Sequence, residues 1–344
     1  MKKKEAFHWA DEVAERIIKE KGNKKKYVCA SGISPSGTVH IGNFREIITT
    51  ELVVRALKDK GKEVRFIYSW DDYDRFRKVP KNAPKEYEKY IGMPISDIPD
   101  MFKCHNSYAE HFEKELEESL KDVGIKPEFI RQSVMYKKCE YAEEIKKVLN
   151  NIKEIKKILD NYREEKLNED WYPIEIYCEK CKKDSTKILN YNKEYEIEYE
   201  CKCGYKNKID FRKKGIVKLS WRLDWPMRWN YEKVDFEPGG KDHAAPGGSY
   251  DTGKQLIKLI WDRDAPSFQL YEWIGFKGGK QFSSSEGNAL TLKECLEIYE
   301  PEVVRYLFAG ARPNAEFAIS FDLDVIKIYS DFDQTEKIYF GKEE

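Results

Sequence analysis

The sequence has no long hydrophobic run and no net charge. No segment approaches the roughly 18 consecutive apolar residues that a transmembrane helix requires, and the N-terminal segment lacks the apolar centre of a signal peptide. We therefore expect a cytoplasmic protein without a membrane partner. Lys+Arg and Asp+Glu both number 62. The overall charge thus neither indicates nor excludes nucleic acid as a partner, and any such partner must meet a local basic surface.

The sequence also lacks internal repeats and low-complexity segments, and its composition is that of a folded protein. With 344 residues, of which 40% are hydrophobic and 36% charged, the chain exceeds the usual size of one hydrophobic core. We expect two or three domains, one of them inserted in another. Disulfides are not expected in the reducing cytoplasm. The closely spaced cysteines therefore indicate a metal site instead.

The N-terminal part carries the pattern of a β-α-β unit. Residues 27–33 form a short apolar run, a Ser/Pro/Gly turn follows, residues 40–58 have helical apolar spacing, and residues 64–70 form a second apolar run. Two strands joined by one helix in this way lie parallel in a sheet. Ligands of such sheets bind in a crevice at the carboxyl ends of the strands, so we expect the functional site there.

The later segments predict further elements. Four prolines interrupt residues 80–101, and helical spacing resumes near Tyr108. An amphipathic pattern predicts a helix over 140–166, and alternating residues predict a small β module over 174–212. The closing segment, 291–340, is expected to be helical.

Two polar segments are candidates for phosphate binding. The first, Ser34–Asn43, reads SPSGTVHIGN and lies where the first strand turns into the first helix, so free backbone N–H groups and the helix dipole favour an anion there. The second, Gln281–Asn288, reads QFSSSEGN and has the composition of a loop that closes over phosphates. Taken singly, the first equally fits a capped helix with a buried histidine, and the second a plain surface loop.

Two groups of residues offer metal ligands. Asp100, Cys104, His105 and His111 supply the oxygen, sulfur and nitrogen ligands that zinc accepts, with unligated surface histidines as the alternative. The second group consists of two close cysteine pairs separated by a hairpin-length stretch: Cys178, Cys181, Cys201 and Cys203. Four thiolates suit a structural zinc that stabilises a small module. Neither group retains an open coordination position, so we assign both to structural zinc.

Longer segments resemble a known family. HIGN after PSG, and SSSEGN, resemble the two signature motifs of class I aminoacyl-tRNA synthetases. The segments SGISPSGTVHIGNFRE, SWDDYDRFRKVP, KLSWRLDWPMRW, GGKDHAAPGGSYDTGK and EVVRYLFAGARPN are similar to the class I lysine–tRNA ligases of archaea and some bacteria. The resemblance runs from about Phe7 to Gly341 and so covers nearly the whole chain.

The resemblance implies an α/β fold, with a Rossmann-like parallel sheet, an inserted zinc-binding domain and a C-terminal helical stem. The implied division places the two halves of the catalytic domain at 1–79 and 215–290, the insertion at 80–214, and the stem at 291–344, ending before an anticodon-binding domain. The implied activity is ATP-dependent activation of lysine, with Mg²⁺, and transfer of lysine to the terminal ribose at the acceptor end of lysine tRNA.

The resemblance also implies roles for individual residues. ATP binding is assigned to Ser34, Gly37, His40, Gly42, Asn43, Asp242, Ser283, Ser284 and Ser285, of which His40, Asn43, Ser283 and Ser285 are the expected catalytic residues. Lysine binding is assigned to Gly32, Ser34, Asp72, Trp221, His243 and Tyr271. A cationic side chain favours an aromatic wall and an acid. Asp71, Asp72 and Asp224 are all available acids, and core packing is the alternative for each aromatic residue.

The sequence departs from the family in its second signature. Gln281 and Glu286 stand where the family carries lysines, and loss of one such contact costs about 3 kcal/mol of transition-state stabilisation. Lys280 and Lys277 lie close enough to substitute through a shifted loop, and an unaltered rate in Lys280→Ala would refute that hypothesis. Two alternatives remain. The expected lack of an anticodon-binding region favours a short paralogue that aminoacylates a different acceptor, and Gln281 with Glu286 favours a weakened homologue that binds ATP, lysine or tRNA without efficient turnover.

Overall fold

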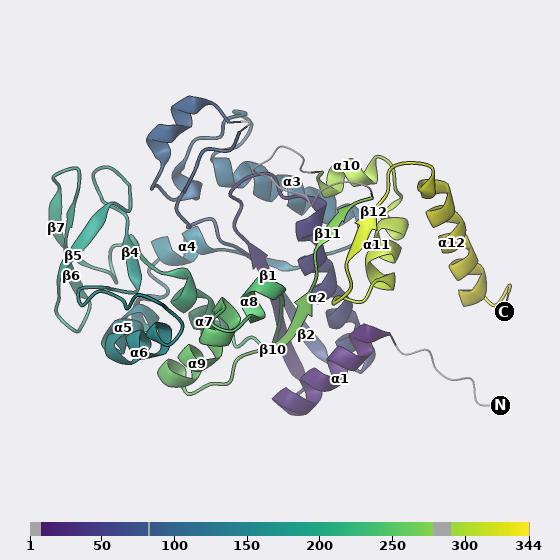
Figure 1. The fold of residues 1–344 in the computed structure, drawn as a ribbon, viewed down its shortest axis with the longest axis horizontal. Coiled ribbons are helices and arrows are strands. Elements are labelled where there is room, and N and C mark those ends of the chain that lie inside the picture. Colours follow the sequence, from purple (N-terminus) through teal and green to yellow (C-terminus); the bar gives the residue numbers. More distant parts are fainter. Residues whose placement is uncertain (1–7, 82, 278–289, 344) are drawn as a thin grey trace.

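The centre of the structure is a parallel sheet. The structure is a computed structural model and describes residues 8–81, 83–277 and 290–343. Its largest sheet has five strands in the order β10-β9-β1-β2-β3, all parallel (Figure 1). These strands are β1 (Lys26–Ile33), β2 (Glu63–Trp70), β3 (Glu128–Arg131), β9 (Phe236–Gly240) and β10 (Ser267–Tyr271).

The predicted β-α-β unit is confirmed. Helix α2 (Ile41–Asp59) joins β1 to β2, and these strands pair in register from Lys26 opposite Glu63 to Ile33 opposite Trp70. The chain adds β2 and β3 on one side of β1, then β9 and β10 on the other, so the strand order reverses beside β1. Such a reversal opens a crevice at the carboxyl ends of the strands.

Both faces of β1 are covered, which explains its apolar sequence. Tyr27 and Cys29 pack in a cluster with α1 (Trp9–Lys21) and α2, whereas Val28 and Ala30 pack in a cluster with α7 (Trp221–Tyr231) and α9 (Ser249–Trp261). Alternate strand residues point to opposite faces, so a near-continuous apolar run is what a doubly covered strand requires.

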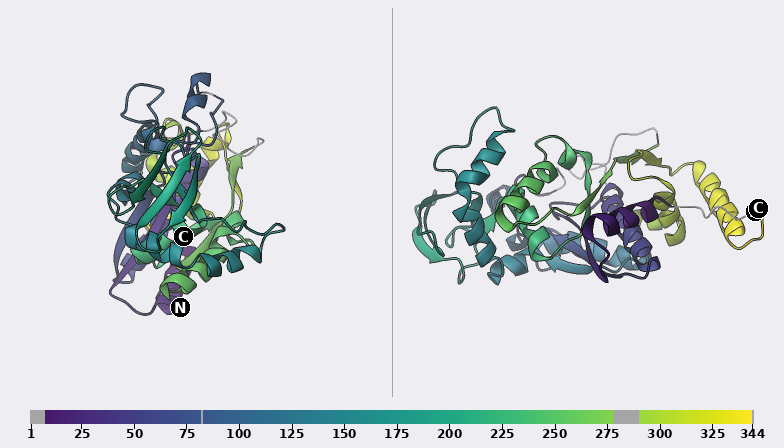
Figure 2. Two further views of the ribbon diagram at one scale, coloured as in Figure 1. Left: turned by 90° about the vertical axis from the view of Figure 1, so that its left-hand side faces the viewer. Right: turned by 90° about the horizontal axis from the view of Figure 1, so that it is seen from below.

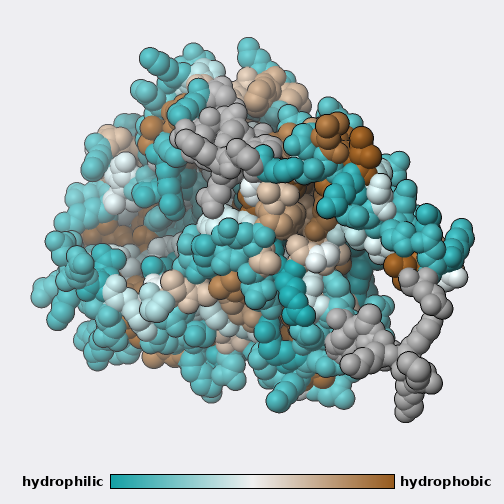
Figure 3. Space-filling view, turned by 45° about the vertical axis from the view of Figure 1, so that its right-hand side comes forward, coloured by the Kyte–Doolittle hydropathy of each residue, from teal (hydrophilic) through white to brown (hydrophobic). Residues whose placement is uncertain are grey.

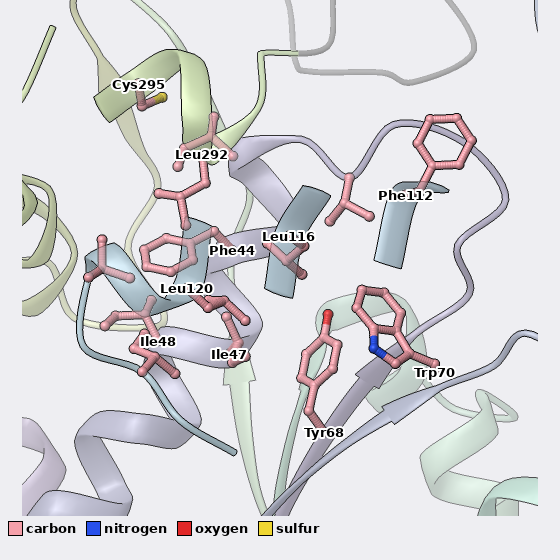
Figure 4. Packing of buried hydrophobic residues seen from close by; sticks show 14 of the residues in the cluster. Phe44, Ile47, Ile48, Tyr68, Trp70, Phe112, Leu116, Leu120, Leu292 and Cys295 are labelled. Carbon is pink, nitrogen blue, oxygen red and sulfur yellow. The ribbon is translucent and has the colours of Figure 1, made fainter. Parts of the chain in front are cut away.

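A second cluster fixes α2 against later parts of the chain. In Figure 4, Phe44 and Ile48 of α2 lie beside Leu120 of α3 (Tyr108–Asp122), with Leu292 and Cys295 of α10 (Leu292–Leu296) above them. Helix α3 begins at Tyr108, as the sequence predicts. Residues far apart in sequence thus hold the start of α2 in place.

The cysteine-containing segment forms an antiparallel module at one end of the molecule (Figures 1 and 2). Strands β5, β6 and β7 pair in sequence order, and β4 pairs with β8. Their bounds are Ile174–Ile176 for β4, Thr186–Tyr191 for β5, Glu196–Cys201 for β6, Lys206–Asp210 for β7 and Val217–Leu219 for β8. The predicted β module is confirmed. By contrast β3, within 80–214, belongs to the central sheet, and the domain boundaries stay a prediction.

Helix α12 (Asp324–Tyr339) lies at the opposite end of the molecule (Figure 1). The expectation that 291–340 is wholly helical is wrong, because β12 (Phe317–Ile319) pairs with β11 (Ile274–Phe276) between α11 (Pro301–Gly310) and α12. A three-residue strand whose partner lies about 40 residues away leaves no periodic signal in the sequence.

The predicted helix over 140–166 is also wrong in one respect. It consists of two helices, α5 (Ala142–Asn150) and α6 (Ile152–Asp160), separated at Asn151. The backbone of Asn151 leaves the helical region, with φ −110° and ψ 16°, and its side chain donates to the carbonyl of Lys147 at 2.8 Å. Asparagine competes for backbone hydrogen bonds in this way, which explains the break.

The remaining described helices are short: α4 (Gln132–Lys137), α8 (Lys241–Ala244) and the 3₁₀ turns Lys85–Tyr90 and Ile95–Asp97. The face in Figure 3 is largely hydrophilic, with scattered hydrophobic residues. Within the described ranges no helix is long and apolar enough to span a membrane. Cytoplasmic location stays a prediction.

Candidate active site

The first signature segment lies at the carboxyl end of β1 and begins α2. His40 is the residue before the helix, and its backbone N–H donates to Oδ1 of Asn43 at 3.2 Å. Gly42 is in the first turn. Ile41 N–H donates to the carbonyl of Leu290 at 2.6 Å, and His40 forms a β-bridge with Thr291. The chain that follows the second signature segment therefore meets the first one at the start of this helix.

The second signature segment lies outside the described residues, and with it Gln281, Ser283, Ser284, Ser285 and Glu286. Lys277 is described, and its ammonium group pairs with Asp324 of α12. The hypothesis that Lys280 or Lys277 replaces a signature lysine stays a prediction.

His40 is uncharged at neutral pH. Burial lowers the pKa of its imidazole from 6.5 to about 4. A neutral imidazole offers one N–H donor and one acceptor without carrying a charge. His40 can therefore orient a phosphate by hydrogen bonding, and charge neutralisation of a triphosphate must come from elsewhere.

A pocket of about 290 Å³ opens beside this segment. One wall is formed by Ser34, Ser36 and Gly37 of the turn after β1, and the other by residues 74–78, which follow β2. Arg77 and Lys78 are exposed, and neither makes an ion pair within the described part of the chain. The pocket thus combines small residues with three cationic side chains, of which Arg75 pairs with Asp184.

Glu46 connects two of the residues predicted to bind lysine. Its Oε1 accepts from Gly32 N–H at 2.9 Å, and its Oε2 accepts from the Tyr271 hydroxyl at 2.8 Å. Desolvation raises the pKa of Glu46 to about 8, although both hydrogen bonds oppose that rise. No cation pairs with Glu46 in the described residues, and its side chain keeps some accessible surface. A largely desolvated carboxyl group that still reaches the surface and has no cationic partner is a candidate receptor for a positive ligand group.

Two other predicted residues meet across an aromatic group. Trp221, at the start of α7, stacks on Trp225 with ring centroids 5.2 Å apart, and the His243 ring lies 5.3 Å from that of Trp225. His243 Nδ1 lies 2.6 Å from the Ser249 hydroxyl, and burial lowers the pKa of His243. Asp242 precedes it on α8 and is exposed.

The acids proposed from the sequence are already engaged. Asp71 binds Arg228 at 2.5 Å, and Asp72 accepts from the backbone N–H of Ser133 at 2.7 Å and from its hydroxyl. Asp224 accepts from the Tyr136 hydroxyl. All three carboxyl groups are buried, and each interacts with a group inside the protein.

Glu46 is the residue that sequence reasoning missed. It lies in the quoted segment SGISPSGTVHIGNFRE, next to a buried arginine and followed by apolar residues of the same helix. A charged pair within an apolar helix face was the available signal, because buried charges occur where they have partners or functions.

The four cysteines converge as predicted. The sulfurs of Cys178 and Cys203 lie 3.7 Å apart, and those of Cys181 and Cys201 lie 3.6 Å apart. These separations are too long for a disulfide, whose sulfurs lie about 2.05 Å apart. Sulfurs around a tetrahedral zinc, each at about 2.3 Å, lie about 3.8 Å apart. The cluster therefore fits a four-thiolate metal site.

The second ligand group also converges. Cys104 Sγ lies 3.1 Å from His105 Nδ1, 3.2 Å from His111 Nδ1 and 3.3 Å from an oxygen of Asp100. Asp100 is fixed by the backbone N–H groups of Cys104 and His105, each at 2.9 Å. The candidate ligand atoms all lie within 4.8 Å of one another. This donor set fits zinc as well.

Comparison with known proteins decides the family. A family model described as tRNA synthetases class I (K) matches residues 7–344. The chain belongs to this family. Among solved structures, the methionyl-tRNA synthetase of Mycobacterium tuberculosis bound by methionyl-adenylate is similar, with a TM-score of 0.54. It is 12% identical and aligns over 90% of this chain and 69% of its own, so it supports the class I synthetase fold alone.

Curated relatives are similar over almost the whole chain. Proteins named lysine–tRNA ligase from Borrelia garinii subsp. bavariensis, Treponema pallidum and Pyrococcus horikoshii are 54%, 50% and 48% identical. Each match covers 98% of this chain and 65% of the relative. The chain thus spans about two thirds of the length of these members of its family.

The raised pKa of Glu46 predicts a pH-dependent stability. The pKa is about 8 in the folded chain and near 4.5 when unfolded, so the folded state binds more protons between these values and loses stability as pH rises through this window. Glu46→Gln removes that titration. From pH 5 to 9 we expect the unaltered chain to lose on the order of 3 kcal/mol relative to Glu46→Gln, measured by urea unfolding without lysine. Parallel pH profiles would contradict the prediction.

Proposed function

We propose that the chain activates lysine with ATP as a lysine–tRNA ligase and transfers it to the terminal ribose of lysine tRNA. The observation that carries this proposal is Glu46, an enclosed acid without a cation partner in the described residues, at the crevice of a class I synthetase fold. The relatives named lysine–tRNA ligase support the same substrate.

In the proposed amino-acid site, Glu46 receives the side-chain ammonium group of lysine. An entering cation lowers the pKa of the acid, so Glu46 ionises as lysine binds. Tyr271 and Gly32 hold both carboxylate oxygens in place. Trp221 and His243 line the aliphatic part of the substrate, with Ser34 near its carboxylate end. We favour Glu46 over Asp72 because Asp72 is buried and accepts from Ser133.

In the proposed ATP site, the lysine carboxylate would attack the α-phosphorus, forming the acyl–phosphate bond while the bond to pyrophosphate breaks, and Mg²⁺ bound with ATP would supply positive charge for the phosphates. Such a step depends on positioning and charge neutralisation. His40, Gly42 and Asn43 at the start of α2, together with Ser34, Gly37 and Asp242, would bind ATP. Ser283, Ser284 and Ser285 complete this proposed set.

The acceptor end of the tRNA would use the pocket between the turn after β1 and residues 74–78, on the side of 74–78, because Ser34 and Gly37 on the other side belong to the proposed ATP site. Its volume of about 290 Å³ suits one nucleotide unit, and Arg77 with Lys78 supplies positive charge for phosphates. The basic stretches at 24–26 and 212–214 are weaker candidates, because Lys24 pairs with Asp235 and Arg212 with Asp210.

We also propose two structural zinc ions, one in each ligand group. Asp100, Cys104, His105 and His111 would close one site, and Cys178, Cys181, Cys201 and Cys203 the other. With four protein ligands in each site, the metal stabilises the fold and leaves the chemistry to other residues. Residues 80–214 would then act as the inserted zinc-binding region, apart from β3, and 291–344 as the stem.

The activity is tested by lysine-dependent exchange of labelled pyrophosphate into ATP, with a panel of amino acids. We expect exchange with lysine alone, because Glu46 selects a cationic side chain. This assay isolates activation from tRNA recognition. Absence of exchange with every amino acid, from folded and metal-loaded protein, would reject the proposed activity and favour a homologue that binds without turnover.

The role of Glu46 is tested by Glu46→Gln. Loss of one charge-assisted contact is worth about 1.5–3 kcal/mol, so the KM for lysine in pyrophosphate exchange is expected to rise about tenfold to a hundredfold. The control is Glu63→Gln, because Glu63 is exposed and pairs with Lys25 at 2.9 Å on the surface. Equal kinetics in the two variants would exclude Glu46 from lysine binding.

The proposed zinc sites are tested by metal analysis. We expect two zinc ions per chain in the unaltered protein and one in Cys181→Ser, since three thiolates hold zinc far less tightly than four. The control is Cys139→Ser, at a half-buried cysteine outside both ligand groups. Two retained zinc ions in Cys181→Ser would refute the four-cysteine assignment.

The acceptor pocket is tested with the double variant Arg77→Ala, Lys78→Ala. We expect its KM for lysine tRNA to rise about tenfold. The slope of log binding constant against log salt concentration should fall by the amount that corresponds to about two phosphate contacts. The control is Lys126→Ala, at an exposed lysine of a separate groove. An unchanged salt dependence in the double variant would place the acceptor end elsewhere.

A further inference from the structure

The tip of the four-cysteine module contacts the loop that carries the cationic pocket. Asp184 follows Cys181 by three residues, and the turn is closed by a hydrogen bond from Cys178 N–H to the Lys183 carbonyl at 2.9 Å. Asp184 Oδ2 accepts from Arg75 Nη1 at 2.8 Å, and Arg75 is in the wall of the pocket. A module at one end of the molecule is thus joined to the edge of the active-site crevice.

Asp184 also holds the segment that braces this loop. Its backbone N–H donates to the Gly92 carbonyl at 2.8 Å. Gly92 N–H donates to the Phe76 carbonyl at 2.9 Å, and Phe76 N–H donates to the Met93 carbonyl at 2.7 Å. Asp184 therefore contacts both of these paired segments: its side chain binds Arg75 in the first, and its backbone N–H binds Gly92 in the second.

Gly92 shows how closely these parts approach. It has φ +91°, and a Cβ at this position would lie 2.7 Å from Oδ1 of Asp184. A side chain at this position would be strained by the backbone conformation and would displace the Asp184 carboxylate. The Asp184 side chain is 11% exposed and that of Arg75 46%, so the ion pair is partly shielded from solvent on the side of the module.

Two further contacts run from the same module to the same loop. The Tyr177 hydroxyl, one residue before Cys178, donates to the Tyr73 carbonyl at 2.7 Å. The Tyr73 hydroxyl in turn donates to the Gly215 carbonyl at 2.7 Å. The module therefore contacts the loop at Tyr73 and Arg75, directly before Arg77 and Lys78.

We propose that Asp184 is a positioning residue through which the four-cysteine module fixes the pocket loop, 73–78, for binding of the acceptor end. The inference rests on the proposed function for its tRNA partner. The proposal predicts different effects on the two steps of the reaction, which are activation of lysine and its transfer to tRNA. Although Ser34 lines the same pocket, none of these contacts involves Gly32, Glu46 or Tyr271 of the proposed amino-acid site. We therefore expect a loosened module to impair tRNA use and to leave lysine activation intact.

The test is Asp184→Ala, followed by hydrogen–deuterium exchange of the amides of Phe76 and Gly92. We expect about fivefold faster exchange at both, as is typical for loss of a partly shielded ion pair that controls local opening. The control is Glu198→Ala, which removes an ion pair with Lys206, at 3.0 Å, from the same module away from the loop. Unchanged exchange in Asp184→Ala, with the module's zinc retained, overturns the proposal.

Gly92→Ala provides a second variant that breaks the contact from the other side. We expect the same acceleration at Phe76. Each variant is then assayed for pyrophosphate exchange and for charging of lysine tRNA. A KM for tRNA raised about fivefold, with lysine-dependent exchange unchanged, supports the positioning role. An unaltered KM for tRNA overturns it. Absence of pyrophosphate exchange in the unaltered chain instead rejects the proposed function, and the deuterium measurement still decides whether the contact positions the loop.

Discussion

The close approach of β1 and β2 at Gly32 is the constraint on which the site depends. A Cβ at Gly32 would lie 2.6 Å from the Ser69 carbonyl oxygen, so no side chain fits there. The backbone N–H of Gly32 is left to face α2, where it meets Glu46 at 2.9 Å. The carboxylate is thereby fixed by strand backbone, and Tyr271 of β10 holds its other oxygen. Two strands and one helix together hold this carboxylate at the crevice of the sheet.

A network of internal ion pairs explains why the neighbouring acids do not compete with Glu46. Arg228 of α7 pairs with Asp71 at 2.5 Å and approaches Asp224 at 3.5 Å, and Lys218 pairs with Asp74 at 3.0 Å. Burying such charges is costly unless each has a partner, and removing one partner leaves the other uncompensated. The network therefore ties α7, with Trp221 at its start, to the carboxyl end of β2. The acids of this network are paired with cations, whereas Glu46 keeps accessible surface and has no cation partner among the described residues.

The sequence was sufficient to predict those features that depend on residues close together in the chain. The apolar runs of β1 and β2 and the spacing of α2 were sufficient for the β-α-β unit, and ligand type with spacing was sufficient to group Cys178 with Cys203 and Asp100 with His111. Glu46 was missed because a helix sequence does not specify which strand residue a side chain meets, and its partner Tyr271 lies 225 residues away. The break at Asn151 and the pairing of β12 with β11 depend on single side-chain contacts and on distant partners, and neither has a period.

The two ends of the crevice differ in how they are held. The side with Glu46 is built from the ends of β1 and β10 and from the N-terminal half of α2, which hydrogen bonds tie together. The other side is a loop after β2 whose shape depends on contacts with a separate module. The module shares one hydrophobic cluster with α5, α6 and α7, and its four cysteines converge within 4.8 Å of one another. The shape of that loop therefore depends on the module, through Asp184 and Tyr177, whereas Gly32 and Glu46 are held by the sheet and by α2 themselves.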